Sequence, residues 1–119
     1  VLFSRPATLY RWKGDWKKRG QGEAKLLKDQ DTGTVRFILR RDEWKRTLRI
    51  VANHYVPPCC VLDPSGEEGT RWVWTAHDYS ESDEPSPEQF ALWFESPKLA
   101  KEFEEVFNEA RKLNATIED

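Results

Sequence analysis

The sequence is poor in the features that disulfide scaffolds and membrane anchors require. Its two cysteines, Cys59 and Cys60, are neighbours, and adjacent cysteines pair with each other only with backbone strain. This spacing excludes a disulfide scaffold and favours a reducing compartment. No window approaches the roughly 18 continuous apolar residues of a membrane span, and the first residues lack the long apolar stretch of a signal peptide. We therefore expect neither a membrane span nor a signal peptide.

Motifs for catalysis and for metal or phosphate binding are also absent from the sequence. The two cysteines and the two histidines, His54 and His77, are the only soft metal ligands, and their spacing matches no zinc pattern. The chain has no Gly-x-Ser-x-Gly, no glycine-rich phosphate loop and no His-Glu-x-x-His. We expect no enzymatic activity, no metal ion and no cofactor.

The chain nevertheless has enough apolar residues to form a hydrophobic core. It has 119 residues, of which 38% are hydrophobic and 13% aromatic, including six tryptophans. A domain typically has about 100 to 150 residues, and one of this size removes roughly two thirds of its extended surface from water. We expect a single folded domain over residues 1–119 and not a disordered segment.

Charge is distributed unevenly along the chain. The net charge is −2, but residues 1–50 have fourteen Lys or Arg against six Asp or Glu, whereas residues 51–119 have five against fifteen. The two segments therefore have net charges of +8 and −10. If folding keeps them apart, the protein has a basic face and an acidic face, and such faces select partners. If folding mixes them, the asymmetry says nothing about function.

Most of the chain has the alternating pattern of β-strands. Between residues 9 and 94 the apolar residues recur with a period of two. The alternation is clearest in residues 35–40, 48–50, 72–76 and 90–94. Turn-forming residues separate these runs, and the acidic stretch from Tyr79 to Glu88 is expected to be an exposed loop. Short strands without intervening helices indicate an antiparallel sandwich or barrel.

The pattern changes to that of an amphipathic helix at Ser96. Ser96 is a suitable N-cap, and Pro97 suits the first helical position. A stripe at helical spacing follows, formed by Leu99, Phe103, Val106, Phe107, Ala110 and Leu113. We expect about four turns that cover the open end of the barrel. The predicted fold is mainly β and resembles the pleckstrin-homology architecture, an antiparallel barrel or sandwich capped by one C-terminal α-helix.

Basic residues gather on one predicted strand and before it. Arg36 and Arg40 lie an even number of residues apart, so they share the face opposite to Val35, Phe37 and Leu39. Because arginine binds carboxylates through two parallel hydrogen bonds, an acidic peptide suits this stripe as well as a phosphate does. A solvated surface without a ligand would have the same composition.

Six segments, in order along the chain, resemble the signature blocks of the Ran-binding domain family. They are Leu9-Tyr10-Arg11-Trp12, Trp16 to Gly22 with Lys25-Leu26-Leu27, Leu39-Arg40-Arg41-Asp42, Ala52-Asn53-His54, Trp72 to Ala76 with Asp78-Tyr79, and Phe90 to Phe94. The resemblance extends from Val1 to about Lys112. It implies a pleckstrin-homology-like barrel that binds the GTP form of the small GTPase Ran.

The resemblance also implies how such a domain acts. The acidic C-terminal tail of Ran wraps around the barrel, while the N-terminal segment of the domain embraces the GTPase. The domain then promotes hydrolysis stimulated by the GTPase-activating protein and helps to dissociate transport-receptor complexes. The implied location is cytoplasmic, at the nuclear pore or with shuttling to the nucleus, without nucleic-acid or membrane partners.

The residues expected to contact Ran follow from this resemblance. The tail is assigned to a basic set: Lys17, Lys18, Arg19, Lys25, Arg36, Arg40 and Arg41. The N-terminal arm is assigned to Val1, Leu2, Phe3 and Leu9. Contacts with the folded part of the GTPase are expected from Trp12, Asn53 and His54.

The sequence departs from the family pattern at several positions. Lys18 replaces an acidic residue, the Lys13-Gly14-Asp15 hairpin is short, and Glu43 to Thr47 is an apparent insertion beside the predicted tail site. Two other binding functions use the same basic residues. A phosphoinositide-binding module of the pleckstrin-homology type and a single-stranded nucleic-acid binder therefore remain as alternatives.

Overall fold

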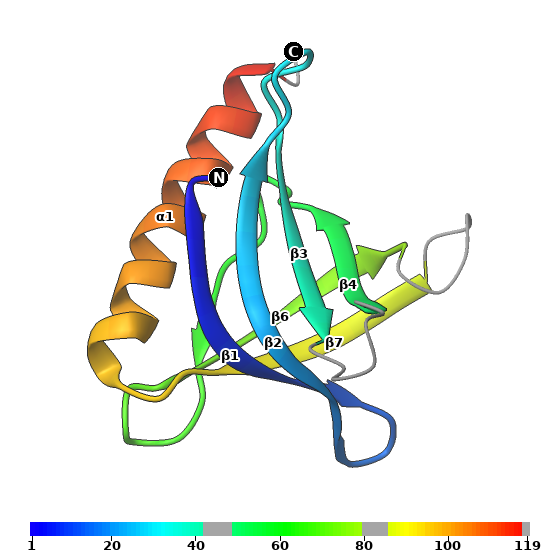
Figure 1. Ribbon diagram of the computed structural model, residues 1–119, viewed down its shortest axis with the longest axis vertical. Coiled ribbons are helices and arrows are strands. Elements are labelled where there is room, and N and C mark those ends of the chain that lie inside the picture. Colours follow the sequence, from blue (N-terminus) through cyan, green and yellow to red (C-terminus); the bar gives the residue numbers. More distant parts are fainter. Residues whose placement is uncertain (42–48, 80–85, 118–119) are drawn as a thin grey trace.

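The computed structural model describes residues 1–41, 49–79 and 86–117, which form seven strands and one helix. The elements are β1 (Phe3–Trp12), β2 (Trp16–Lys28), β3 (Val35–Arg41), β4 (Arg49–Tyr55), β5 (Asp63–Pro64), β6 (Arg71–Asp78), β7 (Ser86–Trp93) and α1 (Pro97–Ile117). The strands form one antiparallel sheet in the order β4-β3-β2-β1-β7-β6-β5 (Figure 1).

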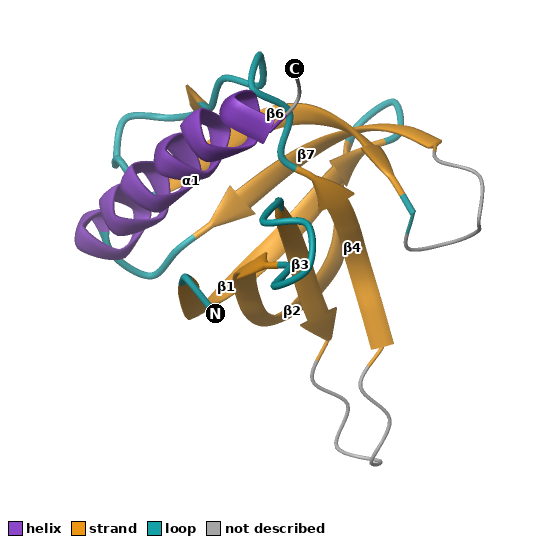
Figure 2. Ribbon diagram, turned by 90° about the horizontal axis from the view of Figure 1, so that it is seen from above, coloured by secondary structure: helices purple, strands orange, loops and turns teal. Residues whose placement is uncertain are grey.

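The sheet bends at β1, which belongs to both of its halves. β1 pairs with β2 from Phe3 to Trp12, but with β7 only from Thr8 to Arg11. At the opposite corner, the amide of Tyr79 donates to the carbonyl of Asn53 (2.9 Å), which joins the end of β6 to β4. These contacts close the strands into the predicted barrel (Figure 2).

The core lies on the concave face of the sheet, and the period-two prediction is confirmed in β3. It is wrong at Ile50 of β4, which is exposed because a register shift at Val51 changes the direction of the side chains. In β3, Val35, Phe37 and Leu39 are fully buried, while the residues between them face outward. Trp74 is buried as well, whereas Trp72 is half-buried and donates from Nε1 to the carbonyl of Ala100 on α1 (2.8 Å). The alternation therefore defines an inner apolar face and an outer polar face.

The helix begins as predicted and is longer than predicted. The Ser96 hydroxyl accepts a hydrogen bond from the amide of Leu99 (3.3 Å), which caps the first turn. α1 then continues to Ile117, so it has 21 residues instead of about four turns. On its buried face, Phe103 packs against two rings of the barrel. The ring centroid of Phe103 lies 5.3 Å from that of Phe3 and 6.0 Å from that of Phe37.

The expected acidic loop is shorter than Tyr79 to Glu88. β7 already begins at Ser86, and Glu88 is buried within it, where it lies 3.9 Å from Arg11 of β1. Residues 80–85 lie outside the described residues, as do 42–48, which include the apparent insertion. Glu88 was predicted to be in the exposed loop because it is charged. It can be buried in β7 because the Arg11 guanidinium compensates its negative charge.

Candidate protein-binding surface

Three cations lie together on the outer face of the sheet. Lys25 of β2 is paired with Ile38 of β3, and Arg36 and Arg40 lie two residues to either side of Ile38. Side chains two apart on a strand share a face, and diagonal neighbours across two strands lie about 7 to 8 Å apart. Lys25, Arg36 and Arg40 therefore form one group, which we call the outer basic face, and Glu23 of β2 lies opposite Arg40 on it.

The Arg36 side chain is held in place by its neighbours. Its Nε donates to Oδ1 of Asn53 on β4 (3.0 Å), and its guanidinium lies 5.7 Å from the ring centroid of Tyr79. The backbone of Asn53 is fixed in turn, because its amide donates to a carboxylate oxygen of Asp78 (2.7 Å). Asn53 was expected to contact the GTPase, and in this structure its side-chain oxygen positions Arg36.

Tyr79 and Asp78 were missing from the predicted site. Both belong to a block that resembles the family, but their position beside Arg36 depends on the closure of β6 against β4. Tyr79 is 42% exposed, so its ring extends the outer basic face toward solvent.

The other basic residues predicted to bind the tail do not belong to the outer basic face, or have side chains outside the described residues. Lys17 and Lys18 are exposed, but they lie beyond the last paired residues of β2 and β3, Gly22 and Arg41. Arg19 occupies the point where the β1–β2 register shifts, and its Nε donates to the carbonyl of Val51 (3.2 Å). The predicted stripe is thus divided, and Arg19 is a half-buried residue that joins β2 to β4. The backbone of Arg41 lies in β3, while its side chain lies outside the described residues.

Two residues assigned to the N-terminal arm belong to the core. Phe3 and Leu9 are 6% and 0% exposed, because the segment is a paired strand whose alternate side chains point inward. Val1 and Leu2 precede the strand and are exposed. Trp12 is 46% exposed at the end of β1, where it packs edge-to-face against Trp16 at 5.3 Å between ring centroids.

His54 is also a core residue, so the expected contact with the GTPase is wrong in this structure. It is fully buried, and its Nε2 accepts a hydrogen bond from Nε1 of Trp74 (2.9 Å). That bond requires the proton to be on Nδ1, which lies 2.8 Å from the carbonyl oxygen of Tyr55. Burial lowers the pKa of His54 to about 4, against an ordinary value of 6.5. The imidazole is therefore neutral at physiological pH.

The cysteines lie beside the edge of β6. Cys59 is exposed and Cys60 is buried, and both are free thiols. Burial raises the pKa of Cys60 to about 11, so its thiol stays protonated and points to the carbonyl of Thr75 (3.8 Å).

Within the described ranges, the structure places no group of three or more His, Cys, Asp or Glu side chains where a metal ion would fit. In the same ranges no helix is long and apolar enough to span a membrane.

Comparison with known proteins identifies the family of this chain. The model of the RanBP1 domain matches residues 1–113. The chain belongs to this family. It is 35% identical over 116 residues to the human E3 SUMO-protein ligase RanBP2, and equally similar to the human RANBP2-like and GRIP domain-containing protein 1. These matches cover 95% of this chain but only 4% and 6% of those proteins.

The fold agrees with that of a solved relative. The crystal structure of the Ran-binding domain from the nuclear pore complex component NUP2 of Ashbya gossypii superimposes with a TM-score of 0.76. It covers 95% of this chain and 97% of the NUP2 chain at 21% identity, which shows a shared fold. The predicted pleckstrin-homology-like barrel with one C-terminal helix is therefore confirmed.

Proposed function

We propose that this RanBP1 domain binds the GTP-bound form of the GTPase Ran and holds the acidic C-terminal tail of Ran on the outer basic face. Membership of the family supports Ran as the partner. The grouping of Lys25, Arg36 and Arg40 on one side of the sheet supports an acidic peptide as the ligand of this face.

The outer basic face suits an acidic peptide for physical reasons. Guanidinium groups bind carboxylates through charge-assisted hydrogen bonds, and three neighbouring cations attract a segment with several acidic residues. Arg36 is already oriented by Asn53, so less side-chain freedom is lost when it binds. Because these cations are near the surface, the association rate should fall as salt concentration rises.

The proposed role is that of an adaptor without catalytic residues of its own. By holding Ran in its GTP form, the domain promotes the GTP hydrolysis that the GTPase-activating protein stimulates in Ran, and the disassembly of transport-receptor complexes. A nuclear pore component contains a domain of the same fold, which supports action at the nuclear pore, and we propose that the domain acts on its cytoplasmic side. The exposed Trp12 is the best remaining candidate for contact with the folded part of Ran.

Calorimetric titration tests this function with three forms of Ran. One is loaded with a non-hydrolysable GTP analogue, one with GDP, and one with the analogue after removal of the acidic tail. We expect tight binding to the first form and much weaker binding to the other two. Equal affinity for all three, or binding to anionic liposomes without binding to Ran, would contradict the proposal.

A further inference from the structure

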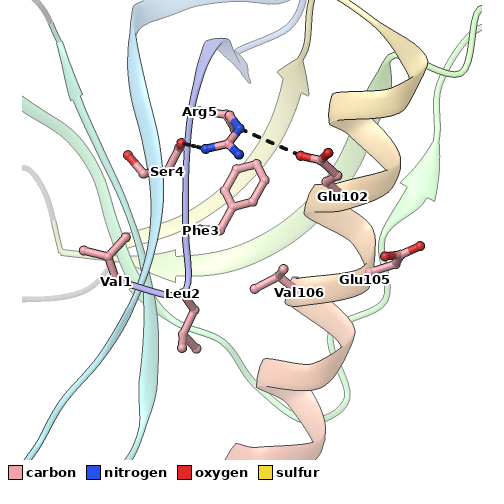
Figure 3. Close-up of a pocket in the computed structure, with 8 residues that line it drawn as sticks. All are labelled: Val1, Leu2, Phe3, Ser4, Arg5, Glu102, Glu105 and Val106. Carbon is pink, nitrogen blue, oxygen red and sulfur yellow. Dashed lines mark hydrogen bonds and ion pairs between the residues drawn. The ribbon is translucent and has the colours of Figure 1, made fainter.

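A groove separates the first half of β1 from α1. It borders the outer basic face, because Ser4 in the groove wall is paired with Lys25 of β2. It has a volume of about 380 Å³ and is lined by Leu2, Phe3, Arg5, Glu102, Glu105 and Val106, among others (Figure 3). One wall is a strand, the other is a helix, and the floor includes the buried ring of Phe3. The groove thus offers both main-chain groups and side chains to a ligand.

The strand wall is an open sheet edge. β1 pairs with β2 on one side, whereas β7 reaches only Thr8 on the other. From Phe3 to Ala7, this second edge therefore has no partner strand among the described residues. An unpaired edge presents N–H and C=O groups that an extended peptide can bind.

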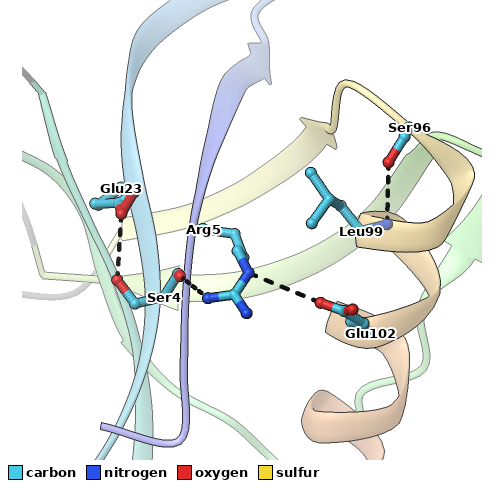
Figure 4. A network of polar contacts seen from close by, with 6 residues as sticks. All are labelled: Ser4, Arg5, Glu23, Ser96, Leu99 and Glu102. Atoms are coloured by element: carbon cyan, nitrogen blue, oxygen red, sulfur yellow. Dashed lines mark hydrogen bonds and ion pairs between the residues drawn. The ribbon is translucent and has the colours of Figure 1, made fainter.

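Two residues show which backbone groups face the groove. The carbonyl oxygen of Ser4 accepts a hydrogen bond from Nη1 of Arg5 (2.8 Å), on the side of the helix (Figure 4). Pro6 has no N–H, and proline occurs in strands where that position faces away from a partner strand. Since backbone groups two residues apart point to the same side, Ser4 and Pro6 both face the groove.

A weak ion pair now spans the groove. Nε of Arg5 lies 3.8 Å from a carboxylate oxygen of Glu102, and the two side chains are 53% and 39% exposed (Figure 4). Exposed pairs of this kind contribute little to stability, so another cation can replace Arg5 beside Glu102. Displacement of the guanidinium would also free the Ser4 carbonyl for a new hydrogen bond.

The charge of the groove defines its ligand. The helix wall presents two carboxylates, Glu102 and Glu105, against the single guanidinium of Arg5. The apolar side chains of Val106 and Leu2, the latter 45% exposed, line the groove beyond the Arg5–Glu102 pair (Figure 3). A ligand that complements both features has a Lys or Arg side chain close to an apolar one.

We propose that this groove is a second binding site, which takes an extended basic peptide as an added strand on β1. The peptide donates to the carbonyls of Ser4 and Pro6 and accepts from the amide of Ser4. Its cationic side chain pairs with Glu102 and Glu105, and an apolar side chain packs against Val106. The site has the opposite charge to the outer basic face, so the domain can hold an acidic and a basic segment at once.

Selection from a displayed library of random peptides of about eight residues tests this site, because such a length spans the open edge with room to spare. We expect the selected peptides to combine Lys or Arg with apolar residues. In NMR titrations they should shift the signals of residues 3–7 and 102–106 and slow the hydrogen exchange of the Ser4 amide. Peptides without a preference for cations, or shifts confined to other surfaces, would overturn the proposal.

Matched variants separate this site from the rest of the surface. Glu102→Lys and Glu105→Lys should each weaken the selected peptides by about tenfold or more, since like charges would then meet. The control Glu109→Lys reverses an exposed carboxylate outside the groove and should leave binding unchanged. Arg5→Ala removes the competing guanidinium and should tighten binding.

Two further results bear on the choice of ligand. Arg40→Glu should leave binding of the selected peptides unchanged, because Arg40 lies on β3, which β2 separates from the groove. This result stays informative even if the domain does not bind Ran. Concentration-dependent dimerisation that Glu105→Lys abolishes would show a second copy of the chain as the occupant, and would overturn the peptide proposal.

Discussion

Nε1 of Trp74 donates a 2.9 Å hydrogen bond to Nε2 of His54, and the two rings lie within the core. The bond joins β6 to β4, the same two strands that position Asp78 and Tyr79 near Arg36. His54 also stacks on Phe90 at 6.0 Å between ring centroids. A neutral imidazole at this position therefore supports the corner of the barrel beside the outer basic face.

Acid should destabilise the fold through His54. Its pKa is about 4 in the folded chain and 6.5 ordinarily, so between these values the unfolded state binds a proton that the folded state does not. The free energy of unfolding should fall by about 1.4 kcal/mol per pH unit below pH 6.5, and by about 3 kcal/mol in total near pH 4. Above pH 6.5 this contribution to stability is fully present.

Comparison with His54→Gln isolates this contribution from the other titrating groups. Urea unfolding of both proteins at several pH values measures the difference in stability. We expect the wild-type advantage at pH 7 to shrink by about 3 kcal/mol by pH 4, because glutamine does not titrate. A difference that stays constant with pH would show that His54 is not the group responsible.

Phe103→Ala should destabilise the domain strongly. The Phe103 ring is fully buried and lies within 6.0 Å, centroid to centroid, of the rings of Phe3, Phe37 and Phe94. Loss of a buried phenylalanine costs about 3 to 5 kcal/mol, measured as the free energy of unfolding in urea. Ile117→Ala, at a side chain 42% exposed near the end of the same helix, is the control and should cost much less. Equal effects of the two substitutions would show that α1 is not packed as described.

Replacement of Asn114 should lower the stability of the domain even when the new side chain has a similar size. Its Oδ1 accepts from the amide of Val35 (2.8 Å), and its Nδ2 donates to the carbonyls of Val35 (3.1 Å) and Val56 (2.8 Å). Asn114→Leu leaves these buried backbone groups without their partner, and each costs about 1 to 3 kcal/mol. We expect a clearly lower melting temperature in calorimetry. A melting temperature equal to that of the wild type would contradict the role of Asn114 in attaching the helix to β3.

The alternation of side chains explains which features could be predicted from the sequence. It placed Arg36 and Arg40 on one face correctly, because β3 is a regular strand. The same alternation puts His54 on the inner side with Ala52, but resemblance to a family block suggested a surface contact instead. For Arg19 the pattern was insufficient, since a register shift in β2 changes the direction of the side chain without any signal in the sequence.

The helix also contains one residue whose role the sequence pattern did not predict. Phe103, Phe107 and Ala110 were predicted to be buried from their spacing, and they are. Asn114 continues the same stripe one turn later, but a search for apolar residues passes over a polar one. Its role depends on Val35 and Val56, which lie more than fifty residues away along the chain. Such a position could be recognised only once the strands were placed.

A double-mutant cycle between the domain and the tail of Ran tests the central claim most directly. Lys25→Glu with Arg40→Glu reverses two charges of the outer basic face, and Lys98→Glu with Lys101→Glu is the matched control at exposed positions on α1. Each protein is titrated with GTP-analogue-loaded Ran, with and without the acidic tail. We predict that the first variant binds full-length Ran at least about tenfold more weakly than the control does. We also predict that the two variants bind tailless Ran equally well. A loss of the same size with and without the tail would contradict the account.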